Sequence, residues 1–294
     1  MLSINNCMVC GSTQFEPFLS CKDYTVSQEE FQIVSCKSCG FKFTNPRPED
    51  AVIGNYYKAE SYVSHTNTKK GLINKLYHAV RNYTLKQKVK LINSYVSRGT
   101  ILDYGCGTGM FLQACVKNGW NGFGMEPDNE ARNIAKENCS NLFSDKTQLQ
   151  ANINEVQFNA ITLWHVLEHV TDMKETLSFF KNKLNSNGVL IIAVPNHVSY
   201  DAKHYQSFWA AYDVPRHIHH FDVSSMTALL KNYGFKLVET KGMKFDSFYV
   251  SMLSEKYKTG NMNLLKAFYT GFMSNLKAKD STQYSSTIYV FKHQ

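Results

Sequence analysis

The sequence predicts an α/β fold, in which helices are wound on a mainly parallel sheet, preceded by a small cysteine-rich domain. Three observations lead to this fold. From residue 100 onward, short apolar runs alternate with amphipathic segments, which is typical of such a sheet. A glycine-rich turn at residues 103–109 joins a strand-like run to a helix-like one. Two Cys-x-x-Cys pairs lie within the first 48 residues.

The length and composition are those of a folded protein with one α/β core and a small appendage. The chain has 294 residues, of which 43% are hydrophobic, and this excludes global disorder. Its formal net charge of +8 favours anionic partners. The N-terminus lacks the regions of a signal peptide, and no apolar run reaches the length of a membrane span. We therefore expect a cytoplasmic protein.

We expect three segments: residues 1–48 as the cysteine-rich domain, 49–98 as a helical linker or cap, and 99–294 as the α/β domain. The predicted strands are 100–104, 121–125, 141–143, 158–164, 187–194, 235–241 and 283–292. The predicted helices are 107–118, 128–138, 172–184 and 223–233. Insertions at 196–222 and 244–280 interrupt the α/β domain, the second with a helix near 262–278. Long connections of this kind usually carry function.

The glycine-rich turn predicts a nucleotide-binding site. Its sequence is Asp103-Tyr104-Gly105-Cys106-Gly107-Thr108-Gly109. The glycines let the backbone turn tightly and approach a ligand, and the following helix directs its N–H groups at that ligand. A dinucleotide motif G-x-G-x-x-G needs a further glycine at Met110, which is absent. The turn therefore suits the methionyl carboxylate and ribose of S-adenosylmethionine (SAM).

An acidic residue after the next predicted strand supports this interpretation. Glu126 ends the run Gly122-Phe123-Gly124-Met125-Glu126. A carboxylate in this position can accept hydrogen bonds from both ribose hydroxyls of the cofactor. The order of strand, glycine turn, helix and acidic residue is more specific than a glycine pattern alone.

The cysteine pairs predict a structural zinc site. They lie 25 residues apart and consist of Cys7, Cys10, Cys36 and Cys39. Each pair can place two thiolates on one metal, and a closed set of four leaves no position for water. Gly11 and Gly40 follow these pairs, where the turn needs a residue without a side chain. Cys21 is predicted to lie in the small core of this ribbon and not on the metal.

Two histidines follow the predicted strand 158–164, in the sequence Trp164-His165-Val166-Leu167-Glu168-His169. Open α/β sheets bind their ligands at this carboxyl edge. An imidazole can accept the proton that a hydroxyl loses during methyl transfer. His165 is therefore a candidate for ligand contact and catalysis. For Glu168 and His169, a base and a structural turn remain alternatives.

The insertion at 196–222 carries a second cluster of histidines and aromatics. Its centre reads Pro215-Arg216-His217-Ile218-His219-His220-Phe221, a spacing that matches no metal-ligand pattern. We expect a loop over the active site, in which Arg216 can bind a carboxylate or phosphate. The candidate catalytic residues of the chain are thus His165, Arg216, His217 and His220.

Two positions near these insertions have simpler interpretations. Asp222 or Ser224 is predicted to cap the next helix. The aromatic run at residues 245–252 either covers the acceptor pocket or packs on the sheet, and packing is the default for such a run.

The segment from 98 to 241 resembles the class I SAM-dependent methyltransferases, and among them the ubiquinone-biosynthesis-type O-methyltransferases. The resemblance rests on Ile101 to Gly109, Glu126, Ile161 to Val170, Asn187-Gly188 and Val194-Pro195-Asn196. It implies a Rossmann-like seven-stranded sheet whose last strand, here 283–292, runs antiparallel. It also implies the residues that contact SAM: Asp103, Gly105, Cys106, Gly107, Gly109, Glu126, Pro127, Asp145, Trp164 and His165.

A zinc ribbon before such a domain is also similar to a bacterial group of methyltransferases that act on sugars and natural products. Tyr56-Tyr57 and Tyr62-Val63-Ser64-His65 look like that group's link between ribbon and core. The sugar C-methyltransferases of the group have a large C-terminal domain. This chain lacks it, which argues against their ketosugar carbanion mechanism.

The leading hypothesis is a SAM-dependent methyltransferase that acts on a small-molecule acceptor, most simply a hydroxyl of a sugar or other biosynthetic intermediate. Two alternatives stay open: an RNA methyltransferase that binds RNA through its ribbon, and a SAM-binding scaffold without activity. Residues 1–48 hold four basic and four acidic residues, so this domain is neutral and nucleic acid is not expected as a partner. The oligomeric state stays open.

Overall fold

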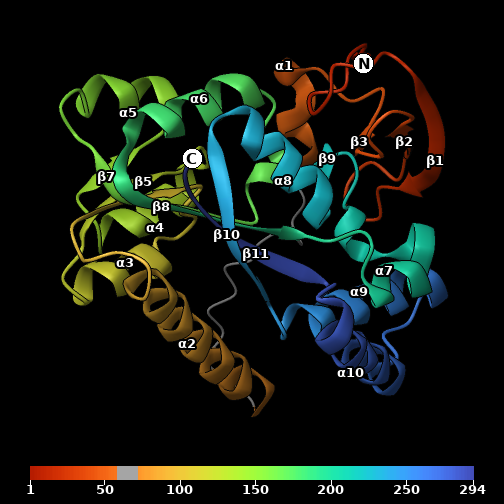
Figure 1. The fold of residues 1–294 in the computed structure, drawn as a ribbon. Helices are drawn as coiled ribbons and strands as arrows, with labels where there is room; N and C mark the ends of the chain where they lie inside the picture. The colour runs from red at the N-terminus through yellow and green to blue at the C-terminus, as the bar shows by residue number, and fades with distance from the viewer. Residues whose placement is uncertain (58–71) are drawn as a thin grey trace. The chain divides into compact units, whose positions relative to one another are not determined.

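The computed structural model describes residues 1–57 and 72–294 (Figure 1). In the long helix α2 (Leu72–Asn93), the side chains are described from His78 onward. These residues form two compact units, each built from stretches distant in sequence. Unit 1 holds residues 1–57, 167–174 and 193–289; unit 2 holds 72–166, 175–192 and 290–294. The predicted segment boundaries at 48 and 98 stay predictions. The predicted link Tyr62–His65 lies outside the described residues.

Unit 1 contains a small sheet that begins with three antiparallel strands of the cysteine-rich segment. They are β1 (Phe15–Lys22), β2 (Glu30–Cys36) and β3 (Lys42–Thr44). A fourth strand, β9 (His219–His220), comes from the histidine-rich insertion and pairs with β3. Phe31 and Ile33 alternate along β2 and are buried, as expected for a strand with one covered face. The insertion at 196–222 is therefore part of the ribbon's sheet.

Helices make up most of the rest of unit 1. Asp222 caps α8 and forms a capping box with Ser225, which confirms the predicted cap. The insertion at 244–280 forms two helices, α9 and α10, which pack side by side (Figure 1). The helical elements are α1 (Asp50–Ile53), η1 (Gly54–Tyr57), η2 (Leu167–His169), α7 (Tyr200–Tyr205), η3 (Gln206–Phe208), η4 (Ala210–Tyr212), α8 (Val223–Asn232), α9 (Asp246–Thr259) and α10 (Leu264–Ser281).

Unit 2 is a parallel sheet with helices. The strands β4 (Thr100–Tyr104), β5 (Asn121–Met125), β6 (Asn141–Phe143) and β7 (Phe158–Trp164) pair in parallel, with β4 between β5 and β7. Apolar residues of β4 and β7 are fully buried, which is why these strands read as nearly continuous apolar runs. The helices of this region are α2 (Leu72–Asn93), α3 (Met110–Lys117), α4 (Asn129–Lys136), α5 (Lys146–Asn152) and α6 (Met173–Lys183).

The main sheet has seven strands in the order β10-β11-β8-β7-β4-β5-β6. It is completed by β8 (Leu184–Pro195), β10 (Phe235–Gly242) and β11 (Ser286–His293). The last strand, β11, is antiparallel, so the predicted Rossmann-like fold is confirmed. None of the described helices is long and apolar enough to cross a membrane.

Three details differ from the sequence prediction. Helix α3 begins at Met110 and not at Gly107, because Gly107 and Gly109 adopt positive φ angles that no α-helix contains. The helices α5, α7 and α9 were not predicted. Within the aromatic run, Phe245 and Tyr249 are exposed, so the default interpretation of packing on the sheet is wrong for these two side chains.

A buried carboxylate joins three elements of unit 1. Asp201 of α7 is fully buried. Its Oδ2 accepts hydrogen bonds from the Trp209 indole N–H at 2.7 Å and from the Ser285 hydroxyl at 2.6 Å. Its Oδ1 accepts one from the Ser274 hydroxyl of α10 at 2.6 Å. Hydrogen bonds to a charged acceptor are about twice as strong as neutral ones, so this residue fixes α7 against α10.

We therefore expect Asp201→Asn to lower the free energy of unfolding by about 2–4 kcal/mol. The asparagine NH2 group would replace one carboxylate oxygen, and a hydrogen-bond donor would then face another donor. Ser274→Ala, which removes one donor and leaves the other two, should cost about 1 kcal/mol. Chemical denaturation followed by fluorescence measures both. Equal stability of Asp201→Asn and the wild type would contradict this role.

Candidate functional site

The glycine turn lies at the carboxyl end of β4 in unit 2. Gly105 and Gly109 have φ angles of 77° and 74°. A Cβ on Gly105 would lie 2.5 Å from Cγ2 of Val166, and one on Gly109 would lie 2.8 Å from Cβ of Ala135. Both positions therefore require glycine for conformation and for space. A Cβ on Gly107 would meet no atom of the described residues within 4 Å, so among these residues the turn is open to a ligand at Gly107.

Glu126 is held in place by the turn itself. Its Oε2 accepts a hydrogen bond from the Gly107 N–H at 2.8 Å, and its Oε1 accepts one from the Asp128 N–H at 2.9 Å. The carboxylate that follows β5 is thereby fixed beside the turn that follows β4. A contact between Glu126 and the ribose of SAM, which the sequence analysis expects, stays a prediction.

Asp103 lies under this turn as a buried acid. It is 2% exposed, and its Oδ1 accepts a hydrogen bond from the Thr162 hydroxyl at 2.7 Å. Burial raises the pKa of Asp103 to about 7, although the Thr162 hydrogen bond and the Lys88 ammonium oppose this shift. These contacts fix the ends of β4 and β7. A direct contact between Asp103 and SAM stays a prediction.

Trp164, at the end of β7, has an aromatic and cationic environment. The Lys88 ammonium lies 4.0 Å from the centroid of its ring, and the Phe111 ring packs edge-on at 5.3 Å. Its indole N–H is buried and has no hydrogen-bond partner among the described residues. Buried donors are rarely left without an acceptor. The next residue, His165, has a φ angle of 58°, a conformation that is uncommon for residues other than glycine.

The other predicted cofactor residues have local roles in the structure. Asp145 caps α5, where its Oδ1 accepts a hydrogen bond from the Gln148 N–H at 2.8 Å. The carbonyl of Pro127 accepts a hydrogen bond from the Arg132 guanidinium at 2.9 Å. Cys106 is buried, and burial raises the pKa of its thiol. Contacts of these three residues with SAM stay predictions.

The residues present fit a nucleoside cofactor. Within the part of the chain that the structure describes, the turn is open at Gly107, the fixed carboxylate of Glu126 lies beside it, and the buried indole N–H of Trp164 has no acceptor. All three features lie in unit 2, at the carboxyl ends of neighbouring strands, where such sheets bind ligands.

Unit 1 contains a second cluster of polar groups around His217. Its Nδ1 lies 2.8 Å from the carbonyl oxygen of Ala211, so Nδ1 carries the proton and Nε2 is left as an acceptor. Nε2 lies 3.9 Å from Oε1 of Glu168 and 3.9 Å from Oδ2 of Asp213. A proton gained at Nε2 would therefore be stabilised by two carboxylates.

His169 belongs to the same cluster but has different properties. Its ring lies 4.6 Å from that of His217. Its Nδ1 lies 3.0 Å from the carbonyl oxygen of Arg216 and 2.9 Å from the Tyr57 hydroxyl. Burial, followed by the neighbouring His217, lowers the pKa of His169 to about 4, so this imidazole stays neutral near pH 7. One ligand-type atom from each of Glu168, His169 and His217 lies within 4.8 Å of the others.

The Arg216 guanidinium forms ion pairs with carboxylates of its own chain. Its guanidinium is 1% exposed and donates hydrogen bonds to both carboxylate oxygens of Asp213, at 2.9 and 2.5 Å. It also donates to Asp23 at 3.3 Å and to the Tyr56 carbonyl at 2.9 Å. This burial favours a structural role over the predicted contact with a substrate anion.

The last two histidines of the loop also lie in the interior. Nε2 of His219 donates to the Val170 carbonyl at 2.9 Å, and Nε2 of His220 lies 3.1 Å from the Thr44 hydroxyl. Burial lowers the pKa of His219 to about 4 and that of His220 well below its usual range. Both residues form β9, so they hold the loop on the ribbon's sheet. For His220, this arrangement favours a structural role over the predicted catalytic one.

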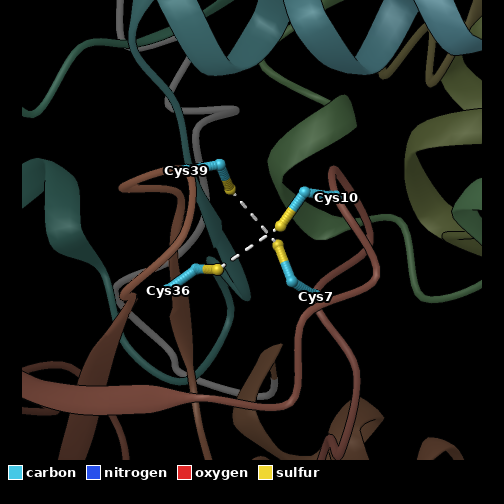
Figure 2. Close-up of side chains that lie close together, drawn as sticks. All are labelled: Cys7, Cys10, Cys36 and Cys39. Atoms are coloured by element: carbon cyan, nitrogen blue, oxygen red, sulfur yellow. Dashed lines mark hydrogen bonds between the residues drawn. The ribbon is translucent and has the colours of Figure 1, made fainter.

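The four cysteines of the two pairs converge in unit 1, as Figure 2 shows. Their sulfur atoms all lie within 4.8 Å of one another; Sγ of Cys7 is 3.6 Å from that of Cys39, and Sγ of Cys10 is 3.5 Å from that of Cys36. Four thiolates at about 2.3 Å from a zinc ion would lie about 3.8 Å apart. The sulfur positions therefore fit a tetrahedral zinc ion.

The turns around these cysteines are those of a metal knuckle. The N–H groups of Gly11 and Gly40 donate to the carbonyls of Cys7 and Cys36, both at 2.8 Å, and the two glycines have φ angles of 77° and 75°. The glycine requirement predicted at these positions is confirmed. Burial raises the pKa of Cys36, but hydrogen bonds from the Cys39 and Ser38 backbone outweigh it and lower the pKa to about 7. Cys21 is buried among apolar side chains, outside the cluster.

Two members of the His217 cluster were missed as site residues by the sequence interpretation. Tyr57 was assigned only to a link, and Asp213 was given no role. For Tyr57, the grouping depends on a contact with His169, which lies more than 100 residues away in the sequence. The sequence signal for Asp213 was its spacing of three and four residues from Arg216 and His217.

Comparisons with known proteins agree with this geometry. A family model described as a methyltransferase domain matches residues 77–240. The chain is 25% identical over 177 residues to the ubiquinone biosynthesis O-methyltransferase of Actinobacillus pleuropneumoniae, covering 55% of this chain and 74% of that protein. It is 23% identical over 190 residues to the protein of the same name from Rickettsia bellii, covering 60% and 77%.

Solved structures show the same fold. The magnesium protoporphyrin IX methyltransferase of Synechocystis PCC 6803 with bound S-adenosylhomocysteine (SAH) aligns with a TM-score of 0.54 and 11% identity, covering 84% of this chain and 100% of that one. A SAM-dependent methyltransferase from Archaeoglobus fulgidus aligns with a TM-score of 0.50 and 17% identity, covering 72% and 94%.

Proposed function

Because this chain belongs to the methyltransferase domain family, we propose that it transfers the methyl group of SAM to a hydroxyl group of a small biosynthetic intermediate. Family membership makes the chain a SAM-dependent methyltransferase. The oxygen acceptor is the finer proposal, and one observation carries it: an acceptor nitrogen of His217 lies 3.9 Å from each of two carboxylates. The names of the curated relatives, which are O-methyltransferases, support the same choice.

The cofactor site of the proposal consists of residues in unit 2. Gly107 offers the open part of the turn, and Glu126 offers a fixed carboxylate for the ribose hydroxyls. The buried indole N–H of Trp164 can donate to an acceptor atom of the cofactor. When bound, SAM supplies an activated methyl group on its sulfonium. The protein then has to position the acceptor and accept its proton.

Proton transfer is the part of the reaction that the His217 cluster can perform. Nδ1 of His217 is held as a donor by the Ala211 carbonyl, so the ring presents Nε2 as the base. The imidazolium formed would be stabilised by Glu168 and Asp213. His169 is less suited to this role because its pKa is lowered to about 4. His165 remains a candidate for contact with the acceptor or the cofactor.

The four cysteines are proposed to hold one structural zinc ion. A closed set of four thiolates leaves no open position for a substrate, so the metal would stabilise the ribbon and take no part in methyl transfer. The proposed partners are thus SAM, zinc and a small acceptor, and the net charge of +8 favours an anionic acceptor.

The cofactor assignment predicts the effect of Glu126→Gln. Loss of the negative charge should weaken the binding of SAH by about 10–100-fold, because hydrogen bonds to a charged acceptor contribute about 1.5–3 kcal/mol. Isothermal titration calorimetry with SAH measures this without an acceptor. Glu130→Gln, an exposed glutamate on α4, is the matched control and should bind normally. Equal affinities of the two variants would exclude Glu126 from the cofactor site.

The acceptor proposal predicts SAH formation when the protein and SAM are supplied with a panel of phenols, catechols and nucleotide sugars. His217→Gln should then lower kcat by about 10²–10⁴-fold, because the general base is removed. His204→Ala, an exposed histidine of α7, is the control.

The outcomes of this experiment separate the hypotheses. An unchanged kcat in His217→Gln would exclude His217 as the base. Activity on transfer RNA and on none of the hydroxyl compounds would favour the RNA methyltransferase instead.

The zinc proposal predicts one zinc ion per chain after purification without chelators, as measured by inductively coupled plasma mass spectrometry. Cys36→Ser and Cys39→Ser should lose the metal, because three thiolates and a serine no longer form a closed site. Cys139→Ser, at a buried cysteine outside the cluster, should retain it. An absence of zinc from the wild type would refute the site, and two zinc ions per chain would point to the His217 cluster as a second one.

A further inference from the structure

Helix α10 turns its large apolar side chains to the solvent. Leu265, Phe268, Tyr269 and Phe272 are 86%, 64%, 62% and 52% exposed, and Leu276 is exposed as well. The buried face of the same helix consists of small residues: Ala267, Thr270, Gly271, Ser274 and Ala278. An amphipathic helix of a monomer normally has the reverse arrangement.

The small residues on the inner face of α10 allow this helix to pack closely against α9. A Cβ on Gly271 would lie 2.8 Å from Cδ1 and 3.0 Å from Cα of Phe248, so α9 and α10 approach each other as closely as glycine allows. The Ser247 hydroxyl donates to the Gly271 carbonyl at 3.0 Å across the same contact. Figure 1 shows the two helices side by side. A rotation of α10 that buried its aromatic face would place large side chains in this contact.

The exposed side chains follow a symmetric pattern. Leu265, Tyr269, Phe272 and Leu276 are separated by four, three and four residues, which is the spacing of a helix–helix seam. The pattern is leucine, aromatic, aromatic, leucine, and it is the same in both directions. If two copies of α10 pack antiparallel about a two-fold axis, leucines therefore contact leucines and aromatic rings contact aromatic rings. Such self-complementarity is the requirement for an isologous interface.

We propose that the outer face of α10 is the interface of a homodimer of this chain. In it, Leu265 packs against Leu276 of the second copy, and Tyr269 packs against Phe272 of the second copy. Phe268 meets Met273 of the second copy at the edge of the seam. Each contact occurs twice because of the two-fold axis.

The area and composition of this face suit a protein partner. At about 150–250 Å² per aromatic side chain, the exposed parts of the three rings amount to roughly 350 Å². The leucines bring the patch to roughly 600 Å², at or above the limit for a typical monomer, and a polar rim brings it near the roughly 800 Å² per partner of a stable complex.

Charge distinguishes a second copy from a lipid surface. Residues 267–276 of α10 contain no charged side chain. A helix that lies on a membrane has a strongly charged face opposite its apolar one, whereas the opposite face of α10 is packed against α9 with small residues. Uncharged aromatic centres are typical of homodimer interfaces.

The test is the mass of the full chain in solution, measured by light scattering and sedimentation velocity over a wide range of concentrations. The wild type should have twice the chain mass of 33.6 kDa. The double variant Tyr269→Glu/Phe272→Glu should weaken association by more than about a hundredfold, because like charges meet at the two-fold axis. It should keep its circular dichroism spectrum, since both side chains are exposed.

Ile134→Glu on α4, also at an exposed apolar residue, is the matched control and should remain dimeric. A wild type of 33.6 kDa at every concentration would overturn the proposal, and so would a dimer that the double variant leaves intact. A monomer that sediments with phosphatidylglycerol vesicles, in a manner that the double variant abolishes, would assign the same face to a lipid surface instead.

Discussion

The buried guanidinium of Arg216 is the interaction on which the organisation of unit 1 depends. It binds Asp213 of its own loop, Asp23 of the ribbon and the Tyr56 carbonyl of the segment that follows the ribbon. A buried cation costs several kcal/mol unless it is paired and hydrogen-bonded, so all three segments have to be in place together. Burial raises the pKa of Asp23, but hydrogen bonds from Ser27 and Thr25, with Arg216, lower it to about 2.

This ion pair also prepares the proposed base. Asp213 binds Arg216 and at the same time lies 3.9 Å from Nε2 of His217. Burial raises the pKa of Asp213, yet its hydrogen bonds with Arg216 and the charge of His217 lower it below the usual value. The carboxylate is therefore charged in a partly buried position, where its field on the imidazole is screened less than it would be in water.

The sequence was most informative where local rules decide the structure. Strand β4, the glycine turn and Glu126 were predicted in order, because positive φ angles and a fixed carboxylate need particular residues at particular spacings. The knuckle glycines Gly11 and Gly40 follow the same logic. In each case, the contacts that decide the structure join residues no more than 19 positions apart.

Prediction failed where the decisive contacts are distant in sequence. Helix α9 was missed for a local reason: its buried residues are Ser247, Ser251, Ser254 and Glu255, which give no apolar period. The two-residue strand β9 exists only because β3 provides its hydrogen-bonding partner. Arg216 was interpreted as a substrate-binding residue because one of its counterions, Asp23, lies 193 residues away, and because its pairing with Asp213, three residues away, was not recognised.

The pairing of β9 with β3 has a consequence for the evolution of such enzymes. Strand β3 follows the second cysteine pair after two residues, and β9 carries two histidines of the loop that also holds His217. The ribbon and the loop thus share one sheet, although more than 170 residues separate them in the chain. Recombination that exchanged the ribbon alone would break that sheet. The ribbon and the loop should therefore be retained or exchanged together during evolution.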